Sequence, residues 1–148
     1  MPGQLFESGP RRVSRADIAA FAELSGDRTA LHSDDAYAAD TPFGRVVAHG
    51  ALNLSVATGL AWACGAFEGT VLAVIGMNIR FDRPVFPDDE LTLRFKVREQ
   101  DRRPKPDRGR VVFDVEVLNQ HGRCVLSGDW TLLLRRAPAA DPPGAPPD

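Results

Sequence analysis

Residues 51–64 read ALNLSVATGLAWAC, and this stretch decides the fold. Its side chains are small or apolar nearly all the way round, and it holds no proline. A helix that is apolar on every face is buried inside its protein. Gly50 stands directly before the stretch, so the backbone N–H groups near Gly50 open the N-terminus of a helix. We therefore predict a central, buried helix over Ala51–Cys64.

The residues after this helix predict strands. Thr70–Phe81 is a long, largely apolar run, and Cys124–Arg135 supplies the last strand after a hairpin turn at Asn119–Gly122. Between them, two segments alternate apolar and polar side chains, the apolar members being Leu91, Leu93, Phe95 and Val97 in the first and Val111, Phe113, Val115 and Val117 in the second. We expect at least four consecutive antiparallel strands. Such a sheet hides one face only by wrapping around the central helix, which makes an α+β domain.

The residues before the central helix predict a strand and two helices. Leu5–Ser8 has the pattern of a short strand that ends at the turn pair Gly9-Pro10. Ser14 precedes an acidic residue by three positions, as in a capping box, and Gly26 stands where a helix ends. These signals predict a helix over Arg15–Leu24. A second, shorter helix is expected over Asp35–Ala39.

Length and composition fit one globular domain. The chain has 148 residues, of which 43% are hydrophobic and 26% are charged. Chains near this length bury roughly 70% of their unfolded surface, which is enough for a real core. We assign residues 1–136 to a single domain. From Ala137 onward Pro, Ala and Asp dominate, so residues 137–148 are predicted to form a disordered tail.

Charge and cysteine content exclude several classes of protein. The net charge is −2, whereas a dedicated DNA-binding protein carries a basic excess. Met1–Pro10 lacks the pattern of a signal peptide, and no segment approaches the ~20 apolar residues of a membrane span. Cys64 and Cys124 lie far apart without metal-ligand spacing and suit a reducing compartment. We expect a cytoplasmic protein with neither a nucleic-acid partner nor a membrane partner.

Two residues on one polar loop are candidates for acid–base chemistry. Asp27 directly follows the predicted end of the first helix, and His32 lies five residues further on. A carboxylate and an imidazole this close can converge on a single water molecule. Imidazole both takes and gives protons near neutral pH. The spacing alone is weak evidence, because an Asp after a helix-ending Gly is more often a turn residue.

The blocks around these two residues resemble a known family. The chain is similar to the MaoC-like, (R)-specific enoyl-CoA hydratases of the hot-dog fold, from Val13 to about Leu93. The similar blocks are Gly26-Asp27-x-x-x-Leu31-His32-x-Asp34, Phe43-Gly44, Ala48-His49-Gly50 and Arg83-Pro84-Val85-Phe86-Pro87-Asp88-Asp89-Glu90-Leu91. Two departures stand out: Thr29-Ala30 replaces the family's usual Asn-Pro, and Asp88 stands where relatives often carry Gly.

The resemblance implies hydration or dehydration of an α,β-unsaturated acyl thioester. Asp27 and His32 would hold a water molecule between them, with Asp27 or the pair removing its proton and the other member protonating the α-carbon. Gly50 N–H, at the helix N-terminus, would stabilise the enolate that forms. His49 and Ser55 are further candidates for substrate binding, although His49 has the simpler role of holding the turn before the central helix. No cofactor and no metal are expected, because the three histidines (His32, His49 and His121) are not grouped for metal binding in the sequence.

Two alternatives stay open at this point. One is a hot-dog acyl thioesterase, in which water attacks the carbonyl carbon instead of the β-carbon. The other is a non-catalytic domain that binds acyl thioesters, an interpretation that the Thr29-Ala30 departure keeps open. The implied substrate is an acyl-CoA or acyl-carrier-protein thioester. Relatives pair two chains edge to edge, so the resemblance also implies a homodimer, which would cover an exposed strand edge.

Overall fold

A computed structural model describes residues 1–101 and 105–137 of the protein. The predicted tail, residues 137–148, lies outside the described residues except for Ala137. The elements in chain order are β1 (Leu5–Arg12), α1 (Arg15–Ser25), the short 3-10 helix η1 (Ala30–His32), α2 (Asp35–Ala39), α3 (Gly50–Ala63), β2 (Val71–Phe81), β3 (Glu90–Gln100), β4 (Arg108–Leu118) and β5 (Cys124–Arg135).

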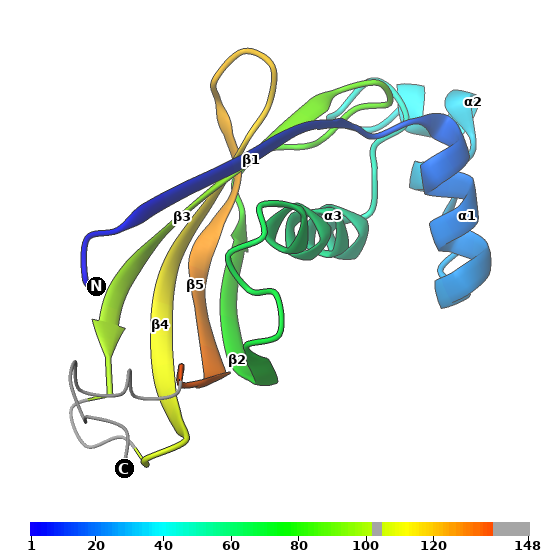
Figure 1. Ribbon diagram of the computed structural model, residues 1–148. Coiled ribbons are helices and arrows are strands. Elements are labelled where there is room, and N and C mark those ends of the chain that lie inside the picture. The colour runs from blue at the N-terminus through cyan, green and yellow to red at the C-terminus, as the bar shows by residue number, and fades with distance from the viewer. Residues whose placement is uncertain (102–104, 138–148) are drawn as a thin grey trace, which may run out of the picture.

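The five strands form one antiparallel sheet that curves around α3 (Figure 1). Its strand order is β1-β3-β4-β5-β2, so β2 lies at one edge and β1 at the other. The predicted α+β architecture is confirmed. Four consecutive antiparallel strands, β2 to β5, follow α3 in the chain as expected, and β2 pairs with β5 and not with β3. The segment between β2 and β3 is too long for a tight hairpin and instead passes α3, where Val85 O accepts a hydrogen bond from Ala48 N at 2.8 Å.

β1 continues past Gly9-Pro10, so the prediction that it ends there was wrong. The pairing with β3 shifts register between Ser8 and Arg11 and then resumes. Gly9 has φ +124°, and a Cβ atom on it would lie 2.8 Å from Leu91 O. Glycine therefore lets the strand bulge against its neighbour and continue.

α1 begins and ends as the sequence predicts. Ser14 accepts a hydrogen bond from Asp17 N, and the Asp17 carboxylate accepts one from Ser14 N, which completes the capping box. Gly26 closes the helix with φ +78°. Its N–H donates to Ala22 O at 2.9 Å, which satisfies one of the last carbonyls. This left-handed residue turns the chain sharply, so the next residue, Asp27, leaves the helix axis.

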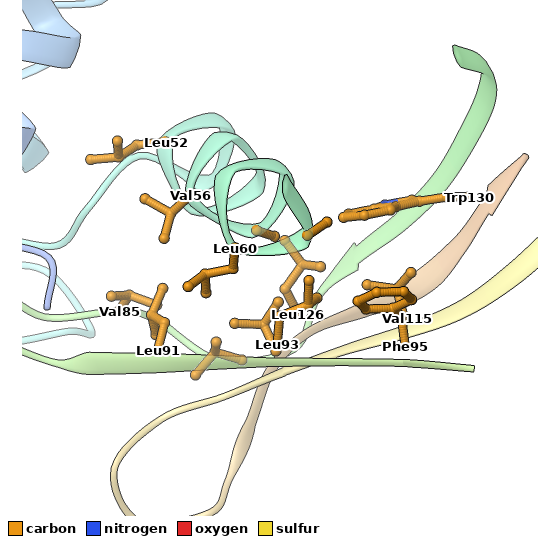
Figure 2. Close-up of a cluster of buried hydrophobic side chains, with 14 of the residues drawn as sticks. Leu52, Val56, Leu60, Val85, Leu91, Leu93, Phe95, Val115, Leu126 and Trp130 are labelled. Carbon is orange, nitrogen blue, oxygen red and sulfur yellow. The ribbon is translucent and has the colours of Figure 1, made fainter. Parts of the chain in front are cut away.

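The core lies between one side of α3 and the inner face of the sheet. Figure 2 shows Val56 and Leu60 of α3 pointing toward the strands that carry Leu91, Leu93 and Leu126. The three sheet residues are fully buried. Burying a leucine side chain contributes about 1.5–3 kcal/mol, so this contact fixes α3 inside the curve of the sheet.

The opposite side of α3 is exposed, and the prediction of burial on every face was wrong for this stripe. The stripe comprises Ala51, Ser55, Thr58, Gly59, Trp62 and Ala63. The exposed fraction of Trp62 is 63%, because the sheet of a single chain covers only one side of the helix. Within the described part of the chain, no helix has the length and apolar character needed to cross a membrane.

Candidate active site

The fold brings Asp27, His32 and His49 together. One carboxylate oxygen of Asp27 and one ring nitrogen from each histidine all lie within 4.8 Å of one another. Asp27 follows the C-terminal glycine of α1, His32 ends η1, and His49 directly precedes α3. One water molecule with hydrogen bonds of about 2.8 Å on each side bridges groups at this separation. The cluster can therefore hold and polarise a single water.

The proton position on His32 follows from its hydrogen bond. Its Nδ1 lies 2.7 Å from the carbonyl oxygen of Val47. A carbonyl only accepts, so Nδ1 carries the proton and Nε2 keeps a lone pair. The same backbone segment holds the loop on the other side, since Val47 N donates to Leu31 O at 3.4 Å. His32 is thus fixed in the tautomer of a base.

Asp27 is an exposed carboxylate with one oxygen already engaged. Its Oδ1 accepts hydrogen bonds from the Thr29 hydroxyl at 2.6 Å and from Thr29 N at 3.2 Å. The hydroxyl bond first, and the backbone bond second, lower the pKa of Asp27 below its ordinary value. Thr29, which replaces the family's usual Asn, therefore stabilises the ionised form of Asp27, and Oδ2 has no hydrogen-bond partner among the described residues.

His49 contacts both catalytic candidates, Asp27 and His32. It is only 2% exposed, and its Nε2 donates to the backbone carbonyl of Asp27 at 2.9 Å. Its ring stacks on His32 with a centroid separation of 3.8 Å and contacts Phe21 at 4.9 Å. Its Nδ1 is buried without a partner among the described residues. His49 thus packs against His32 but is not itself among the residues that line the neighbouring hollow.

The prediction that the histidines are not grouped was wrong for His32 and His49. Their available atoms are nevertheless few, because His32 Nδ1 and His49 Nε2 already form hydrogen bonds to carbonyls. The two ring planes are inclined by only 26°, so the in-plane lone pairs of the two rings lie in nearly parallel planes. This arrangement suits a hydrogen-bonded acid–base cluster better than a tetrahedral metal centre.

A hollow of about 560 Å³ lies beside His32 and the N-terminus of α3. Its lining includes His32, Gly50, Asn53, Phe43 and Phe81. No side chain caps α3, so the first-turn N–H groups near Gly50 are open to a ligand. A Cβ atom on Gly50 would lie 2.8 Å from the Phe81 ring, so glycine is needed for this close approach.

The sequence candidates do not all meet in this hollow. His32 and Gly50 line it, whereas Asp27 is not among its lining residues and lies within 4.8 Å of a ring nitrogen of His32. Ser55 lies on the exposed stripe of α3 and lines another hollow of about 560 Å³, between α1 and α3. Its hydroxyl donates to Ala51 O at 2.8 Å. Phe81 belongs to the site through β2, and sequence reasoning missed it because an apolar residue at a strand end carries no local signal of function.

Known proteins resemble this chain over most of its length. The sequence matches the MaoC like domain over residues 1–119. This chain belongs to the MaoC-like family. A curated relative, the (R)-specific enoyl-CoA hydratase of Aeromonas caviae, is 32% identical over 124 residues, which cover 84% of this chain and 88% of the relative. The family resemblance seen in the sequence is confirmed, and it places this MaoC-like protein among the hydratases and dehydratases.

Solved structures share the fold of this MaoC-like protein. The (R)-hydratase from A. caviae has a TM-score of 0.77 at 31% identity and covers 89% of this chain and 95% of its own. A protein from Archaeoglobus fulgidus described as a monoamine oxidase regulatory protein has a TM-score of 0.85 at 34% identity, over 93% and 92%. A Mycobacterium tuberculosis protein described as a double hotdog fold has a TM-score of 0.80 at 24% identity, over 96% and 44%. The hot-dog fold is confirmed.

Proposed function

We propose that this MaoC-like protein catalyses the reversible addition of water to a trans-2-enoyl thioester, forming an (R)-3-hydroxyacyl thioester. The observation that carries the proposal is the proximity of the Asp27 carboxylate to the His32 ring, which lines the hollow beside the uncapped N-terminus of α3. This reaction requires two side chains that together activate water, next to hydrogen-bond donors for an enolate oxygen. The (R) configuration of the proposed product follows the name of the A. caviae relative.

The water reacts between the two side chains. Asp27 Oδ2 accepts one of its hydrogens and orients it, while His32 Nε2 takes the other as a proton. The water oxygen then bonds to the β-carbon, and the electrons of the double bond move onto the thioester oxygen as an enolate. The imidazolium proton returns to the α-carbon as the carbonyl reforms. One water is consumed, and both catalytic side chains end in their starting states.

Gly50 N–H binds the thioester oxygen in this proposal. The negative charge develops on that oxygen during the attack, at the positive end of the α3 dipole. Each preorganised donor of this kind typically contributes about 10²–10³ in kcat. The absent side chain of Gly50 lets the thioester reach the backbone, with the Phe81 ring as the opposing wall.

The proposed substrate is carried by coenzyme A or by an acyl carrier protein, and the proposed assembly is a homodimer. β2 is an edge strand whose exposed side chains include Val71, Leu72, Val74 and Ile75. The exposed stripe of α3 adds Trp62. An apolar strand edge of this kind associates with another chain or is covered by it. The free thiols Cys64 and Cys124 fit a cytoplasmic location.

The test measures loss of enoyl absorbance with trans-2-enoyl-CoA substrates of graded chain length. Asp27→Asn and His32→Ala should each lower kcat/KM by about 10²–10⁴. Asp35→Asn and His121→Ala are matched controls at exposed positions outside the cluster and should leave the rate unchanged. Free thiol release, followed in parallel, detects thioesterase activity. Wild-type turnover in both cluster variants would refute the assignment.

A further inference from the structure

The amide of Asn53 is a buried polar group that no other part of the site explains. Asn53 is 5% exposed, and its Oδ1 is enclosed without a hydrogen-bond partner among the described residues. Its backbone N–H donates normally to His49 O at 3.1 Å, so the helix itself is regular here. Burying an amide oxygen without a hydrogen-bond donor is unfavourable. Such groups are rare in folded proteins and call for a specific reason.

The position of Asn53 on α3 places its side chain at the hollow. It lies three residues after Gly50, and residues at this spacing share one face of a helix. Helical side chains also lean toward the N-terminus, so the Asn53 amide covers the turn that begins with Gly50. Both residues line the hollow that contains His32. With the oxygen enclosed, the amino group is the polar end that reaches the hollow.

We infer that Asn53 Nδ2 is a second hydrogen-bond donor to the thioester oxygen of the substrate, next to Gly50 N–H. The inference rests on the proposed function and makes Asn53 a catalytic residue of that reaction. As the carbonyl becomes an enolate, its oxygen accepts from the backbone and from the amide at once. The Asn53 amino group thereby gains an acceptor when the substrate is bound, and the bond strengthens as charge develops.

The first experiment compares Asn53→Leu with the wild-type protein. The leucine has a similar volume and needs no hydrogen-bond partner, so Tm should be unchanged or higher. At the same time kcat for trans-2-enoyl-CoA should fall about a hundredfold with KM changed only a few-fold, because the donor acts mainly in the transition state. Thr58→Val, which removes a hydroxyl from the same helix outside the hollow, should keep the wild-type kcat. Wild-type kcat in Asn53→Leu, or a lower kcat accompanied by a lower Tm, would overturn the inference.

The second experiment does not depend on turnover. Butyryl-CoA labelled with ¹³C at its thioester carbonyl has no double bond to hydrate. Its carbonyl stretch should move to lower frequency on binding the wild-type protein and should move about half as far on Asn53→Leu. An equal displacement in the two proteins, or none with either, removes Asn53 from the site. Absence of hydration by the wild-type protein would instead refute the proposed function, while the infrared comparison still decides the contact.

Discussion

The imidazole rings of His32 and His49 stack with their centroids 3.8 Å apart, although only the second ring is fully buried. His49 has its Nδ1 enclosed without a hydrogen-bond partner among the described residues. We conclude that His49 serves as a structural support of the cluster. It carries the ring of His32 on one face and the backbone of Asp27 on one nitrogen.

Replacing His49 should therefore weaken the proposed reaction without removing a reacting group. His49→Leu loses the bond to Asp27 O, and we expect kcat to fall about 10- to 100-fold through misplacement of Asp27. The same change should lower the free energy of unfolding by about 1–3 kcal/mol, because a carbonyl loses its donor. His49→Gln keeps a donor and should recover part of both losses. Steady-state kinetics and chemical denaturation measure the two effects, and equal kcat for His49→Leu and wild type would contradict this role.

Thr29 should set the pH dependence through Asp27. Because the folded-state pKa of Asp27 is lowered, the Thr29 bonds stabilise the folded state above the ordinary carboxyl pKa, and this contribution is lost as pH falls through the lowered value. Thr29→Val removes the hydroxyl bond and raises the pKa of Asp27. The acid limb of the kcat/KM profile should then move to higher pH, while Thr29→Ser should keep the wild-type profile. An unmoved acid limb in Thr29→Val would show that Asp27 ionisation does not control the rate.

Gly50→Ala should test the approach to the helix N-terminus. The new Cβ meets the Phe81 ring at 2.8 Å, and that ring is 57% exposed and therefore able to swing aside into the hollow. We expect Tm to change little but kcat/KM for enoyl-CoA to fall at least about tenfold. Adding Phe81→Leu should restore part of the rate by returning the space. A double variant no faster than Gly50→Ala would mean that the methyl group acts without Phe81.

Asp88 should respond to substitution through its backbone conformation. Its φ is +72°, the one positive value outside glycine among residues 1–101 and 105–137. The left-handed region costs a side-chain-bearing residue roughly 1–2 kcal/mol, with less for Asp. Asp88→Gly should therefore leave the free energy of unfolding equal or raise it by up to about 1 kcal/mol, whereas Asp88→Val should lower it by about 1–2 kcal/mol. Urea denaturation separates the two, and a stable valine variant would argue against the strain.

The proposed homodimer should depend on β2. Ile75 is 52% exposed on this edge strand, and a lysine there would place a charge in the proposed interface. Ile75→Lys should shift sedimentation at micromolar concentration toward the monomer. Leu5→Lys makes the same kind of change on β1, at the opposite edge of the sheet, and should leave the assembly intact. A monomeric wild-type protein would exclude the dimer altogether.

Local signals in the sequence were enough to predict α1, the hairpin after β4 and the alternating strands. The capping box of Ser14 and Asp17 lies within four residues, and the turn at Asn119–Gly122 is equally local. Partners distant in the chain were not predictable. The pairing of β2 with β5 and the passage of β1 beyond Gly9 depend on how the sheet closes around α3, which no short segment encodes.

The candidate site likewise combines features that local sequence signals predict with features that only the fold reveals. Asp27 and His32 share one loop, so their spacing could be noticed, and the family resemblance gave it meaning. The bond from His49 to Asp27 O joins residues 22 positions apart and needs the fold to be seen. Asn53 looked like any polar residue on a helix. Only the absence of a partner for its buried oxygen distinguishes it, and that is a property of the packed structure.

Asp27, His32, Gly50 and Asn53 all lie on the segment from the end of α1 to the first turn of α3, and none lies on a strand. The curved sheet is thus a scaffold, and the residues proposed to react lie on a separate segment of the chain. Substitutions such as Thr29 for the family's Asn can retune proton transfer while the strands keep their packing. Proteins that share this sheet can therefore differ in reactivity while they keep the packing on which folding depends.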